Sequence, residues 1–373
     1  MPTAGDDERW MRMALCIGER GRGQSWPNPS VGCLLVKHGR VLARGVTGPG
    51  GRPHAEAIAL ERAGSAAEGS TAYVTLEPCA HTGNTPACAQ LLATARVKRV
   101  VVAVEDPDPR VSGRGCQMLR EAGITVRTKL LGAQARRAHQ GFFLRVSENR
   151  PMLTLKLAMS FDGGIATADG ESKWITGEAA RRRVHLMRFQ HDAVMVGSGT
   201  AAHDNPDLAP RALGSTPPKL RIVIDSRLTT SCDSQLGRTA HHNPVWLCHT
   251  PAAAASAIEA WNSRGAETIQ CRAQGEVVDL HDCMRALAQR GLTRIFCEGG
   301  GRLAASLLQN RLVDDLVGFY AGLALGSDSH PAIADLGIQM VADAHRFKLV
   351  STTHLGNDVM THWRSDGKIN CDP

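Results

Sequence analysis

A short, spaced set of potential metal ligands constrains this 373-residue chain more than any other feature of its sequence. His54-Ala55-Glu56 is followed by Pro78-Cys79, and Cys88 lies nine positions after Cys79. One imidazole and two thiolates make three protein ligands, which is how a catalytic zinc with one open position is held, whereas a structural zinc takes four. A zinc ion with an open position lowers the pKa of bound water to about 7. The spacing therefore predicts a catalytic zinc site and a fold that brings three separated segments together.

Glu56 fits this site as a proton carrier. If His54 and Glu56 open a helix, their side chains lie about 200° apart around its axis, which leaves the carboxylate free to face bound water. In the zinc nucleobase deaminases the Glu of H-x-E is the general acid/base and not a ligand. A closed structural zinc with His81 as fourth ligand is the competing interpretation, but it leaves Glu56 without a role.

Residue patterns predict alternating helices and strands in the first part of the chain. Expected helices cover about 7–22, 54–63, 88–95 and 115–122, and expected strands cover 31–36, 41–46, 72–76, 99–104 and 124–127. This alternation is typical of an α/β layer structure. His54 then opens a helix, Cys79 follows a strand and Cys88 opens the next helix, so the three ligands can converge at one edge of a sheet.

The second part of the chain shows the same alternation. A polar helix over 133–150 leads to Pro151, and we place the boundary there, between domains of residues 1–147 and 148–373. Expected strands cover 152–159, 193–196, 221–224, 245–248 and 294–297, and expected helices cover 178–190, 252–260 and 303–309.

Composition narrows the class of ligand. The formal charge is +7, yet aromatic residues are only 4% and the densest basic runs are as short as Arg181–Arg183. Nucleic-acid binding usually adds a clustered basic stripe, so small anionic ligands are the better expectation. Eleven cysteines are scattered without framework spacing, and neither a secretory signal nor an apolar run of about 18 residues is evident. We expect a cytoplasmic protein with mostly buried thiols and no membrane partner.

Three loops after expected strands could hold phosphate groups. The loop at Gly197-Ser198-Gly199 has Ala202 where a dinucleotide fingerprint needs its third glycine, so that interpretation fails. Ser226-Arg227 offers a hydroxyl and a guanidinium. Gly299-Gly300-Gly301 feeds a helix N-terminus, which attracts anions. These residues alone do not decide between phosphate loops and flexible turns.

The first 145 or so residues resemble the deaminase domain of the RibD family, the bifunctional riboflavin-biosynthesis deaminase/reductases. The matching pieces are Pro27-Asn28-Pro29, Val31-Gly32, Pro53-His54-Ala55-Glu56, Tyr73-Val74-Thr75-Leu76-Glu77-Pro78-Cys79, Thr85-Pro86, Asp106-Pro107-Asp108-Pro109 and Gly113-Arg114-Gly115. The cysteine spacing separates this part of the chain from transfer-RNA and cytidine deaminases, whose second motif is normally P-C-x-x-C. The resemblance implies a cytidine-deaminase-like three-layer α/β/α domain. In it His54, Cys79 and Cys88 bind zinc, Glu56 is catalytic, and Asn28 and His81 contact the substrate.

Two positions depart from the pattern of that family. Thr47 stands where a His is usual, and Asn84 stands where Lys or Arg is usual. Both are expected near the substrate. A protein with a silent deaminase half is therefore one alternative, and a nucleic-acid base deaminase with an appended domain is another.

The second part resembles the reductase domain of the same family. The matching pieces are Lys156-Leu157-Ala158-Met159-Ser160-Phe161-Asp162-Gly163, Gly170-Glu171-Ser172-Lys173-Trp174-Ile175-Thr176, Asp204-Asn205-Pro206, Leu208, and the loops at Ser226 and Glu298. The resemblance implies a dihydrofolate-reductase-like α/β domain that uses NADPH. Its cofactor contacts would be Ala158, Trp174, Thr200, Asp204, Ser226, Gly300, Gly301, Arg302, Leu303, Ala304, Ala305 and Ser306. Its substrate contacts would be Lys156, Ser172, Arg188, Leu208, Arg211 and Glu298.

The guanidinium forks of Arg188 and Arg211 suit a bidentate grip on phosphate. Lys156 and Glu298 are candidates to position the substrate, and no acid for the reduction is obvious.

The resemblance thus implies two consecutive reactions in riboflavin biosynthesis. A zinc-dependent hydrolase site would remove the 2-amino group of 2,5-diamino-6-(5-phosphoribosylamino)pyrimidin-4(3H)-one. An NADPH-dependent oxidoreductase site would then reduce the ribosyl C1′ to give the ribitylamino product. We expect a homo-oligomer, a dimer by preference, that binds a small phosphorylated pyrimidine and no nucleic acid.

Overall fold

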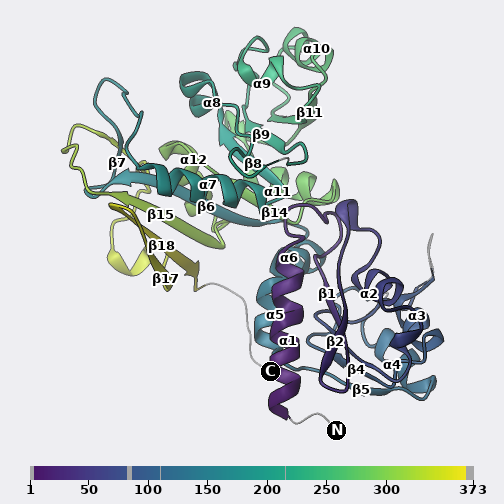
Figure 1. The fold of residues 1–373 in the computed structure, drawn as a ribbon. Coiled ribbons are helices and arrows are strands. Elements are labelled where there is room, and N and C mark those ends of the chain that lie inside the picture. The colour runs from purple at the N-terminus through teal and green to yellow at the C-terminus, as the bar shows by residue number, and fades with distance from the viewer. Residues whose placement is uncertain (1–3, 82–85, 110, 215, 367–373) are drawn as a thin grey trace. The chain divides into compact units, whose positions relative to one another are not determined.

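The computed structural model describes residues 4–81, 86–109, 111–214 and 216–366, which form two compact units, Met1–Arg150 and Pro151–Pro373 (Figure 1). Each unit has its own sheet and its own hydrophobic core. The division at Arg150 and Pro151 follows directly on the end of a helix at Glu148.

The first unit contains a five-stranded sheet in the order β2-β1-β3-β4-β5. Its strands are β1 (Gly32–Lys37), β2 (Arg40–Val46), β3 (Thr71–Val74), β4 (Arg99–Val102) and β5 (Thr125–Arg127). The pairs β1/β2 and β1/β3 are antiparallel, and β3/β4 and β4/β5 are parallel. Parallel neighbours need a crossover, and two helices, α3 (Cys88–Thr94) and α4 (Arg114–Glu121), occupy those connections.

Helices cover both faces of this sheet. Figure 1 shows α1 (Ala4–Glu19) and α5 (Gly132–Ala138) on one side, and α2 (Ala55–Ala63), α3 and α4 on the other. The α2 helix lies very close to β2: a Cβ added at Gly45 would come within 1.9 Å of the Ala55 carbonyl oxygen. The expected α/β/α layers are therefore confirmed. The absence of a side chain at Gly45 allows the start of α2, directly after His54, to pack against β2.

A buried carboxylate ties α1 to the sheet. Asp7 accepts a hydrogen bond of 2.7 Å from the Tyr73 hydroxyl on β3 and pairs with Arg99 and Arg127 at 2.6 Å. Burial alone would raise the pKa of Asp7, but the bonds from Arg99, Tyr73 and Arg127 lower it below its ordinary value. Asp7 thus joins the first helix to three strands.

One expected element differs in the structure. The single helix expected over 133–150 is two helices, α5 and α6 (Gln140–Glu148), which are interrupted at His139. His139 is buried, and its Nε2 lies 3.1 Å from the Thr75 hydroxyl oxygen near the end of β3. That contact is a tertiary one, and the helical periodicity of the sequence could not predict it.

The second unit is built on a nine-stranded sheet in the order β11-β10-β9-β8-β14-β6-β15-β18-β17. Its strands are β6 (Met152–Ser160), β8 (Ala193–Gly197), β9 (Leu220–Ile224), β10 (Val245–His249), β11 (Glu267–Gln270), β14 (Arg294–Cys297), β15 (Asp315–Ala321), β17 (Phe347–Leu355) and β18 (Asp358–Ser365). Strands β11 to β15 in this order are parallel, and β15, β18 and β17 are antiparallel. Strands buried on both faces are near-continuous apolar runs, as in Val194–Val196.

Helices and two small ribbons complete the second unit. The helices are α7 (Glu178–Phe189), α8 (Ser198–Asp204), α9 (Gln235–Arg238), α10 (Ala255–Ser263), α11 (Leu280–Gln289) and α12 (Gly301–Gln309). The ribbons pair β7 (Gly164–Ala166) with β16 (His330–Pro331), and β12 (Ala273–Gln274) with β13 (Val277–Val278). The dihydrofolate-reductase-like α/β expectation is confirmed.

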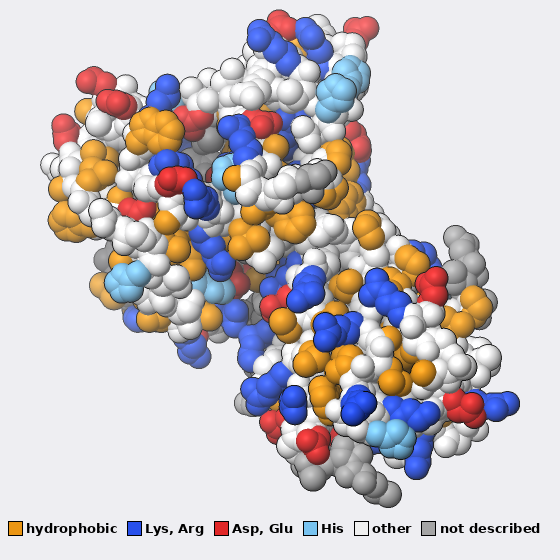
Figure 2. All heavy atoms as spheres, viewed as in Figure 1, with side chains coloured by type: hydrophobic (Ala, Val, Ile, Leu, Met, Phe, Trp, Pro, Cys, Tyr) orange, Lys and Arg blue, Asp and Glu red, His pale blue; other side chains and the backbone are white. Residues whose placement is uncertain are grey.

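The surface has mixed character. On the face that Figure 2 shows, Lys and Arg side chains are dispersed among polar and apolar ones rather than gathered into a stripe. Within the described residues, every helix is too short or too polar to cross a bilayer.

Candidate active sites

The three potential zinc ligands lie where regular elements of the first unit begin or end. His54 is the residue directly before α2, Cys79 follows β3 after a short turn, and Cys88 is the first residue of α3. Helix starts and strand ends meet at one edge of an α/β sheet, which is the usual place for ligands in such folds. The local order of elements therefore delivers all three side chains to one point.

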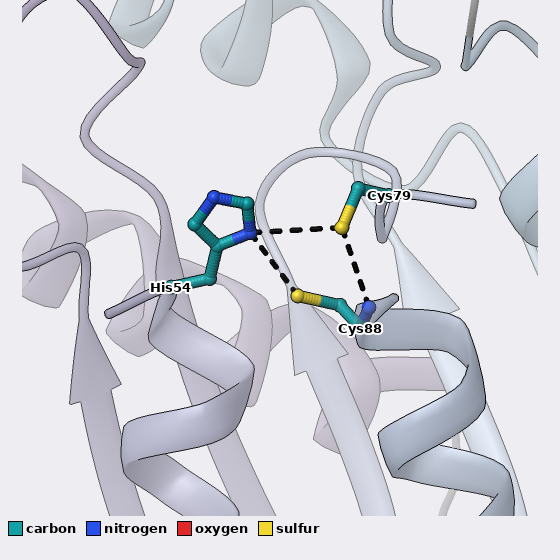
Figure 3. A group of neighbouring side chains, drawn as sticks. All are labelled: His54, Cys79 and Cys88. Carbon is teal, nitrogen blue, oxygen red and sulfur yellow. Dashed lines mark hydrogen bonds between the residues drawn. The ribbon is translucent and has the colours of Figure 1, made fainter. Parts of the chain in front are cut away.

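The ligand atoms are close enough to share one ion. Nδ1 of His54 lies 3.2 Å from Sγ of Cys88 and 3.6 Å from Sγ of Cys79, and the backbone N–H of Cys88 donates to Sγ of Cys79 at 3.3 Å. All three ligand atoms lie within 4.8 Å of one another. Figure 3 shows the three side chains pointing toward a common centre.

The donor set fits zinc. A hydrogen bond from the Cys88 thiol, helped by His54, lowers the pKa of the Cys79 thiol to about 4. That same Cys79 thiolate, together with burial, raises the pKa of Cys88. Only one of these two adjacent thiols ionises readily without a metal ion. A bound cation would stabilise both as thiolates. Imidazole and thiolates are the donors that zinc takes in proteins, and three of them leave a fourth position open.

Glu56 is enclosed beside these ligands. It lies in the first turn of α2, and only 3% of its surface is exposed. Burial raises the pKa of Glu56 to about 7, from an ordinary 4.5. A carboxyl group with a pKa near 7 can both accept and release a proton at neutral pH. This is the property that a proton carrier at the site needs.

His81 does not join the group of ligand atoms. Its side chain is exposed, and among the described residues the group consists of His54, Cys79 and Cys88 alone. The structure thus offers no support for a closed four-ligand site with His81. Asn84, the position without the usual basic side chain, lies outside the described residues.

Two other residues considered from the sequence are held by the backbone. Asn28 donates from Nδ2 to the Gly51 carbonyl oxygen at 3.0 Å. Thr47 is buried, and its hydroxyl oxygen accepts a hydrogen bond of 2.9 Å from the Val31 N–H at the entrance to β1. Thr47 therefore serves the backbone of the loop in front of β1.

Glu77 is a functional neighbour that sequence reasoning assigned no role. Its Oε2 accepts hydrogen bonds from the N–H groups of Gly113 at 2.9 Å and Asp106 at 3.3 Å, and its Oε1 accepts from Cys116 at 2.9 Å. Glu77 thereby fixes the loop after β4 and the start of α4 to the residue two positions before Cys79. The run Glu77-Pro78-Cys79 could have indicated this role, because a buried carboxylate close to a metal ligand needs hydrogen-bond donors.

A second site lies in the other unit, in a pocket of about 1290 Å³. It is lined by residues at the carboxyl ends of β8, β9 and β14, and by residues along β6. Open α/β sheets bind their ligands at such strand ends. Sixteen of the reductase residues singled out from the sequence line it: Lys156, Ala158, Ser172, Trp174, Arg188, Thr200, Asp204, Leu208, Arg211, Ser226, Glu298, Gly300, Gly301, Arg302, Leu303 and Ser306.

Two expected cofactor contacts lie elsewhere. Ala304 and Ala305 are buried in α12 and do not line the pocket. The pocket also includes His185, which the sequence did not suggest. His185 precedes Arg188 by three positions on α7, and side chains at this spacing share a helix face. That periodicity was the signal that could have found it.

A charged triad forms one wall of the pocket. Arg188 donates from Nε to one oxygen of Glu298 and from a terminal nitrogen to the other at 3.0 Å, and Nζ of Lys156 lies 3.7 Å from Glu298. Burial alone would raise the pKa of Glu298, but the charges of Arg188 and Lys156 lower it. Burial lowers the pKa of Lys156 despite its acidic neighbour. The fork of Arg188 is therefore occupied by Glu298, which leaves Arg211 as the more available guanidinium.

A tight glycine turn forms a second wall. Gly299 and Gly300 have φ values of 72° and 93°, and α12 begins at the next residue. The Thr200 hydroxyl donates to the Gly299 carbonyl at 3.1 Å, and a Cβ at Gly300 would come within 2.8 Å of that hydroxyl oxygen. The turn thus opens the N-terminus of α12 into the pocket, where its free N–H groups suit an anion.

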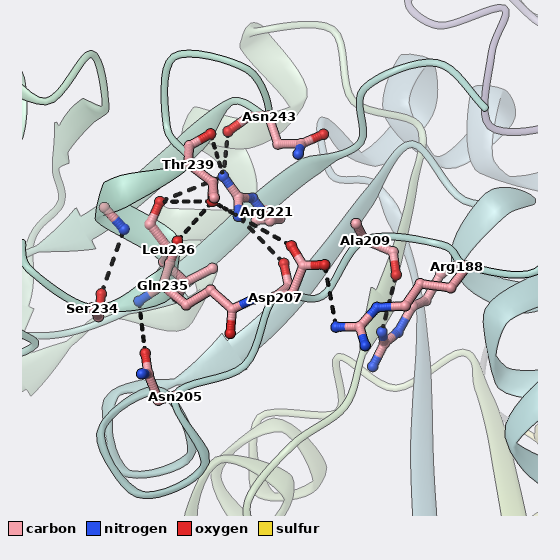
Figure 4. A network of polar contacts seen from close by, with 12 residues as sticks. Arg188, Asn205, Asp207, Ala209, Arg221, Ser234, Gln235, Leu236, Thr239 and Asn243 are labelled. Carbon is pink, nitrogen blue, oxygen red and sulfur yellow. Dashed lines mark hydrogen bonds and ion pairs between the residues drawn. The ribbon is translucent and has the colours of Figure 1, made fainter. Parts of the chain in front are cut away.

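A buried arginine holds the loop that carries Leu208 and Arg211. Arg221 of β9 is fully buried and donates to the Thr239 hydroxyl at 2.7 Å and to the Asn243 carbonyl (Figure 4). It also donates to the Asp207 carbonyl at 3.3 Å, and the Asp207 carboxylate pairs with Arg211 at 3.2 Å. This network fixes the loop at the pocket's edge.

Models of known families match both units. The model for the cytidine and deoxycytidylate deaminase zinc-binding region matches residues 4–104, and the model for the RibD C-terminal domain matches residues 151–361. The two matches fall on the unit with the His-Cys-Cys cluster and on the unit with the large pocket.

Curated relatives match this chain over most of its length. The chain is 39% identical to riboflavin biosynthesis protein RibD of Actinobacillus pleuropneumoniae, covering 95% of this chain and 94% of the relative. It is 38% identical to RibD of Escherichia coli K12, over 95% and 98%. Among solved structures, Acinetobacter baumannii RibD superposes with a TM-score of 0.86 at 34% identity, over 97% and 99%. A Thermotoga maritima structure described as a diaminohydroxyphosphoribosylaminopyrimidine deaminase/5-amino-6-(5-phosphoribosylamino)uracil reductase superposes at 0.84 with 30% identity, over the same shares.

Proposed function

This chain belongs to the RibD family of bifunctional riboflavin-biosynthesis enzymes, and from that premise we propose how its own residues carry out the two reactions. It is a deaminase and a reductase, with a zinc-binding deaminase region in the first unit and a RibD reductase domain in the second. Its substrate is a small pyrimidine. We propose that this is 2,5-diamino-6-(5-phosphoribosylamino)pyrimidin-4(3H)-one for the first site, that the second site takes the deaminated product, and that the reductant is NADPH.

In the deaminase site, His54, Cys79 and Cys88 hold one zinc ion, which when bound supplies the Lewis acidity that makes water a nucleophile at neutral pH. Glu56 accepts a proton from the attacking water and returns it to the leaving amino nitrogen. The water oxygen bonds to C2, the bond from C2 to the amino nitrogen breaks, and ammonia leaves. Asn28 and His81 contact the pyrimidine, and the Gly51 carbonyl holds the Asn28 amide in place.

One observation carries the deaminase proposal. Three soft ligand atoms lie within 4.8 Å of one another, and the buried carboxyl group of Glu56 follows the His54 ligand by two residues. A structural zinc site would use a fourth ligand and would give a buried acid no task.

In the reductase site, the N-terminus of α12 and the hydroxyls of Thr200 and Ser226 bind the cofactor, which when bound supplies the hydride. The pocket orients the opened ribosyl C1′ against it. Glu298 holds Lys156 and Arg188 in fixed positions, so that Lys156 faces the substrate. Arg211 binds the substrate phosphate, because its side chain is 60% exposed at the pocket edge while Arg188 is engaged by Glu298.

The test supplies the substrate to the wild-type protein and to a Glu56→Gln variant, with and without NADPH. Ammonia release without NADPH, absent from the variant, followed by NADPH oxidation in the wild type, is the expected result. NADPH oxidation only with predeaminated substrate would mean that the first unit is silent, and Thr47 and Asn84 would then be changed to the family's usual residues. The cytoplasmic location and the homodimer stay predictions, the latter to be checked by sedimentation.

A further inference from the structure

A second cluster of potential metal ligands lies in the reductase unit, apart from both active sites. Cys248, Cys271 and Cys283 are buried, and their three Sγ atoms lie within 4.8 Å of one another. None of the three lines the large pocket. The ligand-atom spacing meets the same limit as that of His54, Cys79 and Cys88.

Three different elements bring these thiols together. Cys248 lies in β10 and pairs with Ile224 of β9 and Ile269 of β11. Cys271 directly follows β11, and its N–H donates to the His249 carbonyl at 2.8 Å. Cys283 lies in the first turn of α11, and its N–H donates to the Asp279 carbonyl at 2.9 Å. Each backbone position is thus fixed independently, as a preformed site requires.

We propose that Cys248, Cys271 and Cys283 bind one thiophilic metal ion, with Cu⁺ favoured over Zn²⁺ because a structural zinc takes four ligands. Soft thiolates select these ions over the hard cations that oxygen ligands prefer. Within the described parts of the chain, no carboxylate, histidine or further cysteine joins the group, so three sulfurs provide the whole protein coordination. Because all three thiols are buried, the site gives a substrate no access, and its role is structural.

The cluster lies at the base of a hairpin that borders the reductase pocket. Cys271 and Cys283 flank β12 and β13, and the Asp279 N–H donates to the Arg272 carbonyl at 2.9 Å between them. The Val278 N–H donates to the Ser226 hydroxyl at 3.1 Å. Gln274, Val277 and Val278 line the pocket.

An ion that joins the two ends of this hairpin to β10 therefore restrains one wall of the pocket. This consequence for cofactor binding rests on the proposed function, whereas the metal site itself does not.

Metal stoichiometry tests the proposal without any assay of activity. The full-length protein, reduced and dialysed after incubation with zinc or, anaerobically, with cuprous ion, is subjected to elemental analysis. With at least one of the two ions we expect two equivalents per chain in the wild type. We expect one equivalent in Cys248→Ser, Cys271→Ser and Cys283→Ser, and two in the matched control Cys232→Ser, a part-buried cysteine of the same unit outside the cluster. The same number of metal equivalents in the wild type and in every triad variant, with both ions, would overturn the proposal.

Hydrogen exchange of the wild type locates the second ion even if a variant fails to fold. Amides of residues 272–279 should exchange more slowly in the metal-loaded protein than in the chelator-treated protein. The slowing should reach about a hundredfold when the free ion is at 100 times its Kd, provided that only the closed hairpin binds it. Equal exchange in both forms would contradict the site. If ammonia release and NADPH oxidation both failed while these two results held, the proposed function alone would be wrong.

Discussion

The carboxylate of Glu77 accepts a hydrogen bond of 2.9 Å from the backbone N–H of Cys116, which lies 39 positions later in the chain. Because the other oxygen of Glu77 accepts hydrogen bonds from the N–H groups of Gly113 and Asp106, one side chain fixes both the loop after β4 and the start of α4. Glu77, which directly precedes Pro78 and Cys79 in the motif, therefore binds backbone N–H groups.

A Glu77→Gln variant should be less stable and should bind zinc more weakly. The amide keeps one acceptor oxygen but turns an NH₂ group toward backbone donors, and leaving buried donors unpaired costs about 1–3 kcal/mol each. Thermal unfolding and zinc titration measure the two effects. Glu61→Gln, on the exposed side of α2, is the control and should change neither. An unaltered zinc affinity in the Glu77 variant would show that the loop does not position Cys79.

Glu56 should make the metal-free protein less stable as the pH rises. Burial raises its pKa to about 7, from the ordinary 4.5 that it has when unfolded. The folded protein then retains a proton that the unfolded chain has lost, so this contribution is fully present below pH 4.5 and is lost as the pH rises to about 7. A shift of this size corresponds to about 3 kcal/mol.

The comparison that isolates this effect is wild type against Glu56→Gln, both stripped of metal, unfolded at pH 5 and at pH 7.5. The difference in stability between the two proteins should change in favour of the variant at the higher pH. A difference that stays constant with pH would mean that Glu56 is ionised throughout. The variant should also keep three zinc ligands and fail to release ammonia.

An Arg188→Met variant should lose reduction and keep deamination. Removing Arg188 leaves the buried Glu298 charge paired only with Lys156, whose Nζ lies 3.7 Å away, at a cost of up to about 3–5 kcal/mol. Lys156 would also lose the neighbour that shares Glu298 with it. NADPH oxidation with predeaminated substrate and ammonia release from the first substrate separate the two effects. Arg182→Met, on the same helix but in an exposed pair with Glu178, should leave both unchanged; equal losses in the two variants would point to damage to α7.

A Gly300→Ala variant should weaken cofactor binding. Gly300 has a φ of 93°, and an added Cβ would lie 2.8 Å from the Thr200 hydroxyl oxygen. Gly163→Ala is a matched control, because its φ is 92° and nothing lies within 4 Å of its Cβ position. Both variants bear the backbone penalty of about 1 kcal/mol. Only the first should raise the Kd for NADPH, measured by fluorescence titration. A similar rise in both would attribute the effect to backbone strain alone.

The zinc ligands could be predicted from the sequence because they lie in two short local patterns. His54 and Glu56 are two residues apart, and Cys79 and Cys88 follow recognisable strand and helix signals. The hairpin of β1 and β2 was equally visible, because its two strands are adjacent in the chain.

Contacts between distant residues could not be predicted in this way. Arg188 and Glu298 are 110 positions apart, and the sequence around either residue does not indicate that the two form a pair. Cys248, Cys271 and Cys283 lack the spacing of a known motif, so they were expected to be ordinary buried thiols. The interruption of the helix at His139 depends on Thr75, and strands β15, β17 and β18 were not anticipated.

The order of strands in the second sheet has a consequence for how the protein is made. Strand β14 lies between β6 and β8 and hydrogen-bonds to both, yet it is translated about 100 residues after β8, which takes about 5–20 s on a ribosome. During that interval β6 and β8, two apolar strands, have been synthesised but their shared neighbour has not. Nascent reductase units are therefore exposed to aggregation for seconds, whereas the sheet of the first unit is already complete when β6 emerges.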